Sequence, residues 1–152
     1  MKQALLAVVL AVMGSAMPAQ ESPVLVSPAD VKWVDAPPSL PAGSKVAVLY
    51  GDSTKEGPFT MRAKLPADYK VPPHFHPATE TVTILSGTLH MSMGDTFDAS
   101  KAKAMGAGSF AALPGKSPHF VFTKEETVIQ VSGMGPFSVT YVNPADDPRN
   151  KK

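Results

Sequence analysis

The sequence predicts an all-β fold, a sandwich or barrel of about eight short strands within a single domain. Sixteen prolines and eleven glycines interrupt the 152-residue chain every few positions. After the N-terminal region, no segment of helical length keeps an apolar period of 3.6 residues. Short runs rich in β-branched and aromatic residues lie between the interruptions instead, which is typical of strands joined by turns.

The N-terminus has the pattern of a secretory signal. Lys2 is followed by an apolar run over 4–13 and by small residues over 14–20, where cleavage after Ala16 or Ala19 is expected. We favour Ala19, which gives a signal peptide over 1–19. The apolar run is too short to cross a bilayer core of ~30 Å, and without cysteine there is no lipid anchor. We therefore expect an exported protein, periplasmic or extracellular, with no membrane anchor.

The mature chain divides into three parts in order. Residues 20–44 are expected to form an extended N-terminal arm, with Trp33 packed on the domain. Residues 45–143 form the β domain, and 144–152 a flexible tail. Residues 98–108 are expected to be a loop with one helical turn. The predicted strands cover 45–50, 59–65, 80–86, 88–93, 109–113, 119–123, 127–133 and 137–142.

Charge and cysteine content exclude several classes of partner and stabilisation. Loss of Lys2 reduces Lys plus Arg from 14 to 13, which equals the 13 Asp plus Glu, so the mature chain is formally neutral. It has no basic run apart from the C-terminal Asn-Lys-Lys, which argues against nucleic-acid binding. Because cysteine is absent, stability must come from burial and backbone pairing rather than from disulfides.

The stretch VPPHFHPATE over 71–80 contains three candidate metal ligands, two histidines and a glutamate. In a strand, His74 and His76 project to one face, and Glu80 has the same parity at the start of the next apolar run. The prolines before His74 fix the backbone and aim the imidazoles, while Pro77 breaks the strand ahead of Glu80. Two imidazoles and a carboxylate with open positions suit iron, manganese, nickel or zinc.

These residues resemble the two motifs of the cupin family. The first is glycine, five residues, His-x-His, three or four residues, Glu, six residues and Gly. The second is glycine, five residues, Pro-x-Gly, two residues, His, three residues and Asn. The matching residues are His74, His76, Glu80 and Gly87 in the first motif and Gly108, Pro114 and His119 in the second. More narrowly, the chain is similar to small secreted bacterial cupins that are grouped with the cupin half of ChrR-type anti-sigma factors.

Three positions depart from the motifs. Asp68 stands where the first motif has glycine, and aspartate tolerates the left-handed backbone that this turn requires. Gly115 comes one place early in the second motif, and Thr123 replaces its asparagine. None of the three is a ligand position, but they weaken any transfer of activity from a particular cupin enzyme.

The resemblance implies a double-stranded β-helix, the jelly-roll barrel of cupins. It further implies one divalent transition-metal ion per chain, of iron, manganese, nickel or zinc, held by His74, His76, Glu80 and His119. By parity His90 is expected to face outwards, and Met91 and Met93 are expected to pack in the core rather than bind copper. Gln130 is either a residue that supports the site or a solvent-facing strand residue.

Function is open between two classes. One is a metal-dependent dioxygenase or isomerase acting on a small organic molecule in an apolar interior, for which no catalytic residue can be assigned. The predicted interior lining is Val82, Ile84, Leu89, Met91 and Val121. That lining offers no general acid or base apart from Glu80, so a non-catalytic sensor or scavenger of the cell envelope is the alternative. Because cupins commonly pair sheet edges, a homodimer is compatible with either function.

Overall fold

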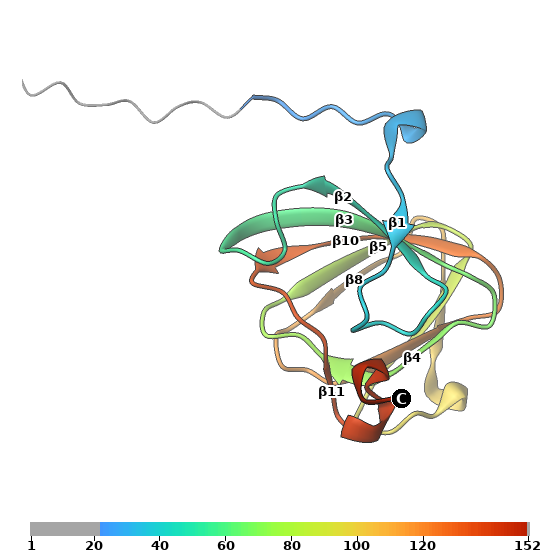
Figure 1. Cartoon of the computed structure of the whole chain (residues 1–152). Coiled ribbons are helices and arrows are strands. Elements are labelled where there is room, and N and C mark those ends of the chain that lie inside the picture. Colours follow the sequence, from blue (N-terminus) through green and yellow to red (C-terminus); the bar gives the residue numbers. More distant parts are fainter. Residues whose placement is uncertain (1–21, 152) are drawn as a thin grey trace, which may run out of the picture.

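The computed structural model describes residues 22–151, which form two antiparallel β-sheets packed face to face (Figure 1). The six-stranded sheet has the order β1 (Val34–Asp35), β2 (Lys45–Tyr50), β3 (Gly57–Leu65), β10 (Thr127–Gly135), β5 (Glu80–Ser86) and β8 (Phe110–Leu113). The five-stranded sheet has the order β11 (Thr140–Tyr141), β4 (Lys70–Phe75), β9 (His119–Thr123), β6 (Thr88–Met93) and β7 (Lys103–Gly106). The all-β jelly-roll prediction is therefore confirmed.

The core lies between the two sheets and follows from the strand period of two. In β5 the residues Glu80, Val82 and Ile84 are buried, while the residues between them are half-buried on the outer face. Leu89 and Met91 of β6 face them from the other sheet and are buried in the same apolar cluster. The predicted lining residues are thus all part of the packed core.

Two turns show why particular residues stand where they do. Gly87 joins β5 to β6 at a φ of 73°, and a Cβ there would lie 2.5 Å from the carbonyl oxygen of Glu126, so no larger residue fits. Asp68 has a φ of 57°, which confirms that aspartate takes the left-handed position expected of glycine in the motif.

Most predicted strands agree with the structure, and one loop does not. The strands at 45–50, 80–86, 88–93 and 119–123 have the predicted bounds. The expected loop over 98–108 contains the predicted helical turn, a 3-10 helix at Ala99–Lys101, but also the strand β7. Alanine and lysine have low strand propensity, yet β7 forms because it pairs with β6 at the sheet edge. The last predicted strand shrinks to the two residues of β11.

The N-terminal arm is fastened to the domain by two tyrosines. The hydroxyl of Tyr69 donates to the carbonyl oxygen of Pro41 at 2.6 Å, and that of Tyr141 donates to the carbonyl oxygen of Ser39 at 2.9 Å. We call residues 36–44 the strap, because this segment runs across the domain between β1 and β2. Before it, a 3-10 turn at Pro28–Asp30 precedes Trp33, which lies 4.9 Å below the Lys64 ammonium.

The C-terminal residues form two short turns. The 3-10 helices Pro144–Asp146 and Pro148–Asn150 follow one another, and Arg149 bonds the side chain of Asp147 and the carbonyl oxygen of Val139. The predicted signal peptide over 1–19 and its cleavage site lie outside the described residues. Within 22–151 no helix has the length and apolar character needed to cross a bilayer.

Candidate metal centre

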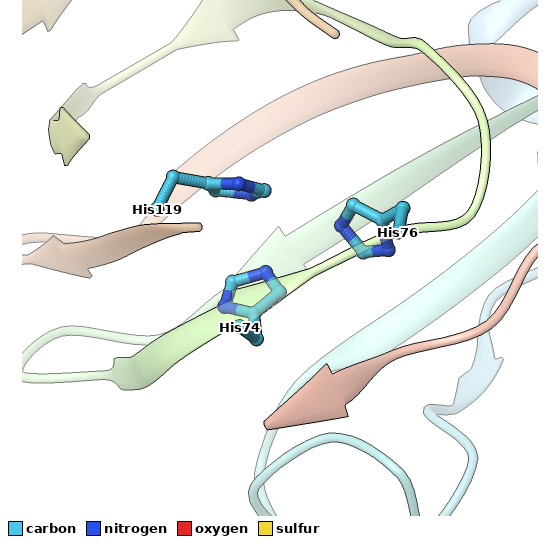
Figure 2. A group of neighbouring side chains, drawn as sticks. All are labelled: His74, His76 and His119. Carbon is cyan, nitrogen blue, oxygen red and sulfur yellow. The ribbon is translucent and has the colours of Figure 1, made fainter. Parts of the chain in front are cut away.

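Three histidines converge at one end of the barrel. His74, near the end of β4, is the direct partner of His119, the first residue of β9, so both side chains project into the barrel. His76 follows β4 just beyond its last residue. Figure 2 shows the three rings turned towards a shared space. One ring nitrogen from each lies within 4.8 Å of the others, and all three residues are buried.

Each histidine is held by a backbone carbonyl group through its Nδ1 atom. The acceptors are Pro72 for His74 at 2.8 Å, Ser117 for His119 at 3.1 Å and Ser138 for His76 at 2.8 Å. A carbonyl oxygen can only accept, so each Nδ1 must carry the proton. The neutral ring then has its lone pair on Nε2, the atom free to bind an ion.

The carboxylate of Glu80 reaches the same space from the opposite sheet. Its Oε2 atom lies 3.3 Å from Nε2 of His76 and 3.5 Å from Nε2 of His119, and the side chain is almost fully buried. Since Nδ1 already carries a proton, a hydrogen bond from either Nε2 to Glu80 requires a second proton on that ring. A divalent ion would balance the buried negative charge in place of that proton.

The pKa values of two site residues favour the forms that bind metal. Burial, together with the neighbouring His119 and His76, lowers the pKa of His74 to about 3, so this imidazole is neutral near pH 7. Burial alone would raise the pKa of Glu80, but hydrogen bonds with His119 and His76 outweigh it and hold the pKa at about 2. Glu80 is therefore ionised.

Aromatic side chains hold two of the rings from the sides. Phe137 stacks on His76 with ring centroids 4.2 Å apart and an interplanar angle of 19°. Tyr141 pairs with His74 across β11 and β4, with ring centroids 6.0 Å apart. No local sequence pattern indicates either contact, because both residues come from far along the chain. The three carbonyl acceptors were also missed, although two of them, Pro72 and Ser117, stand immediately before a Pro-His dipeptide.

The structure brings all four predicted ligand residues together and keeps the other candidates apart. His90 lies on the outer face of the sheet, stacked on Phe122 with centroids 4.6 Å apart. Gln130 accepts a hydrogen bond from Arg62 at 3.2 Å, on the outer face of the other sheet. A donor set of three imidazoles and one carboxylate fits a divalent transition metal. The ion itself remains a prediction.

The loop before His119 is hydrogen-bonded to His76, just beyond the end of β4. The backbone N–H of Lys116 donates to the carbonyl oxygen of His76 at 2.7 Å. Lys116 has a φ of 62°, so the left-handed position of the motif falls on lysine rather than glycine. Gly115 is needed for another reason, because a Cβ there would lie 2.7 Å from the carbonyl oxygen of Pro77.

Comparisons with other proteins give one family and a group of similar folds. The family model described as a domain of unknown function (DUF4437) matches residues 24–139. Among curated proteins none matches the sequence. A candidate acetylacetone dioxygenase from Methylibium petroleiphilum PM1 has a TM-score of 0.67 and 17% identity, over 88% of this chain and 90% of that one.

Two further solved structures are similar. The polyketide cyclase RemF from Streptomyces resistomycificus has a TM-score of 0.65 and 21% identity, over 82% of this chain and 88% of that one. The anti-sigma factor ChrR from Rhodobacter sphaeroides, solved with SigE, has a TM-score of 0.52 and 16% identity, over 70% of this chain and 50% of that one. At these identities the likeness shows the fold alone.

Proposed function

The chain belongs to the DUF4437 family and is a cupin, and from that basis we propose that it binds one divalent transition-metal ion and acts on a small organic molecule as an oxygenase-type enzyme. The ligands in this proposal are His74, His76, Glu80 and His119. The observation that carries it is the backbone carbonyl group that lies within hydrogen-bond distance of Nδ1 in each of the three rings. All three Nδ1 atoms donate to backbone carbonyl groups, so all three Nε2 lone pairs remain for an ion.

The residues of this chain have distinct parts in that function. The three carbonyl acceptors and the stacked Phe137 hold the rings in place, and the apolar core excludes water behind them. Glu80 supplies the negative charge that offsets part of the ion's charge. When bound, iron, manganese or nickel would supply redox or Lewis-acid chemistry, and zinc Lewis-acid chemistry alone. The candidate dioxygenase among the similar structures supports the oxygenase class.

A second function is favoured by what the core lacks. Glu80 is the one carboxylate among the four candidate ligands, and the hydroxyl groups of the buried Tyr69 and Tyr141 donate to carbonyl groups of the strap, so no second group for proton transfer is assigned. A cupin that binds an ion or ligand without turnover would need none. The similarity to the anti-sigma factor ChrR supports this alternative, a sensor or scavenger of the cell envelope.

Metal analysis followed by turnover measurements separates the two functions. The protein, purified from its native compartment, should contain about one divalent ion per chain. Oxygen uptake with phenols, flavonoids and thiols then tests for catalysis, with His76→Ala as the inactive variant and His90→Ala as the matched control. Turnover lost only in His76→Ala supports the enzyme. Tight ion binding without oxygen uptake supports the sensor or scavenger, and absence of ion binding contradicts both.

We also propose that the protein acts outside the cytoplasm. The support is the sequence pattern of a signal over 1–19. The intact mass of the protein from its native host should correspond to a chain beginning near Gln20. A mass that retains residues 1–19 would contradict export by this route.

A further inference from the structure

The inner face of the five-stranded sheet carries one continuous row of side chains at the histidine end. Tyr141 pairs with His74, His74 with His119, and His119 with Met93, the last residue of β6. Directly paired residues in antiparallel strands project to the same face, with Cβ atoms roughly 5 Å apart. Met93 therefore lies beside His119 and projects from the same face of the sheet.

Exposure changes abruptly along this row. Tyr141, His74 and His119 are 5%, 5% and 2% exposed, whereas Met93 is 49% exposed. The same change occurs along β6, where the inner-face residues Leu89 and Met91 are 0% and 7% exposed. The row thus meets solvent at Met93, so the expectation that this residue packs in the core is wrong.

The cause is the length of the neighbouring strand. The pairing of β7 with β6 runs from Thr88 to Met91 and does not reach Met93. Beyond that point β6 has a strand partner on one side only, namely β9. The other flanks of the site are covered, by Phe137 against His76 and by Tyr141, which the strap holds through Ser39.

We propose that Met93 forms the wall of the entrance to the metal centre and selects ligands with an apolar flank. The inference rests on the proposed function and names the substrate class: a small molecule with one or two oxygen donors for the ion and an apolar substituent beside them. Methionine suits this position because its unbranched thioether is apolar and adapts to different shapes. No member of the row, Tyr141, His74, His119 or Met93, offers a fixed charge that would favour an ionic substituent.

Two hydroxamates that share a chelating group test this class. Protein loaded with Co²⁺ is titrated with acetohydroxamate and hexanohydroxamate, and binding is followed by the visible absorption of the ion. The wild type should bind hexanohydroxamate more tightly, at about fourfold for each methylene that becomes buried. Met93→Gln keeps the side-chain length but adds a polar amide, and should remove most of that preference. Met134→Gln is the matched control, because Met134 is 53% exposed but lies on β10, outside the row.

A bulkier variant tests the entrance directly. Met93→Trp should slow the association of azide with the bound Co²⁺ severalfold, while Met134→Trp should not. Co²⁺ affinity, measured separately, should stay unchanged in all four variants, because none alters a ligand. A wild type without preference for hexanohydroxamate, or a Met93→Gln variant that keeps the preference, overturns the inference while leaving the proposed metal site intact. Failure of the wild type to bind Co²⁺ overturns the proposed function, and the inference with it.

Discussion

The two faces of the five-stranded sheet each carry histidine, and they use it differently. On the inner face His74 and His119 are buried, their Nδ1 atoms donate to carbonyl groups, and their rings lie 4.3 Å apart. On the outer face His90 stacks on Phe122. Nearby, Phe97 packs on Phe120 with ring centroids 4.6 Å apart, and the Lys70 ammonium lies 3.4 Å from the centroid of the Phe97 ring. Whether a histidine of this sheet can bind an ion therefore depends on its burial and on the partner of its Nδ1 atom.

The largest difference between the faces should appear in metal affinity. Glu80→Ala removes the one anionic group of the site, so affinity for a divalent ion should fall by more than the ~10-fold typical of changes around a ligand. His90→Ala should leave affinity unchanged and alter stability by less than about 0.5 kcal/mol, as at other surface positions. Isothermal titration of both variants with one ion measures this. If His90→Ala loses the ion while Glu80→Ala keeps it, the assignment of inner and outer faces is wrong.

The pH dependence of stability should also come from the inner face. In metal-free protein the unfolded chain protonates His74 below pH 6.5, whereas the folded chain resists protonation down to about 3. Because the unfolded state then binds more protons, stability should fall by about 1.4 kcal/mol per pH unit as pH falls through this window. The lowered pKa of Glu80 contributes stability above pH 4.5 that is lost as pH falls to about 2.

Urea unfolding at pH 7, 5 and 4 measures this pH dependence, with His74→Gln and His90→Gln compared with the wild type. His74→Gln should flatten the profile between pH 6.5 and 4, because that residue no longer titrates. His90→Gln should change the profile less than His74→Gln, because burial and Lys124 lower the pKa of His90 by a smaller amount. Equal slopes in all three proteins would contradict the assignment of this pH dependence to His74.

The outer face should affect stability without affecting the ion. Phe120 is 1% exposed although it faces away from the core cluster, because Phe97 packs against it. Phe120→Leu should therefore cost about 1.5 kcal/mol of unfolding free energy through lost packing. Ion stoichiometry in the folded variant should equal that of the wild type. Loss of the ion at unchanged stability would mean that the two faces are not independent.

The smallest effect is expected in the loop that joins the six-stranded sheet to His119. Lys116 has a φ of 62°, so Lys116→Gly should relieve backbone strain and raise stability by up to about 1 kcal/mol. The greater conformational entropy of glycine in the unfolded chain offsets part of this gain. Gly115→Ala should do the opposite, since its Cβ would meet the carbonyl group of Pro77. Thermal unfolding of both variants tests the pair. A loss of stability in Lys116→Gly would show that the lysine side chain contributes more than the backbone strain costs.

The alternation of residues was enough to predict the two faces. Parity placed Glu80, Val82 and Ile84 inside and His90 outside, and the structure confirms each placement. The edge strand β7 could not be predicted in the same way, because it forms from residues of low strand propensity through its pairing with β6. That pairing depends on tertiary contacts, which local sequence does not contain.

The surroundings of the four candidate ligands were only partly visible in the sequence. For His74 and His119 the carbonyl acceptor is two residues earlier and precedes a proline, so the arrangement is local. For His76 the acceptor is Ser138, which is 62 residues away. Phe137 and Tyr141 likewise come from the end of the chain. Contacts of this range follow from the fold, and no local pattern predicts them.

The strap bears on the order in which the protein can fold. The hydrogen bond from Tyr141 to Ser39 joins residues 102 positions apart, so it closes a loop that includes nearly the whole barrel. Long loops close late, because their entropy must be lost before the contact contributes. Tyr141 is also the neighbour of His74 in β11 and β4. We therefore expect the surroundings of His74 to be completed only after β11 has docked, so that an ion arriving during synthesis or transport would meet an unfinished site.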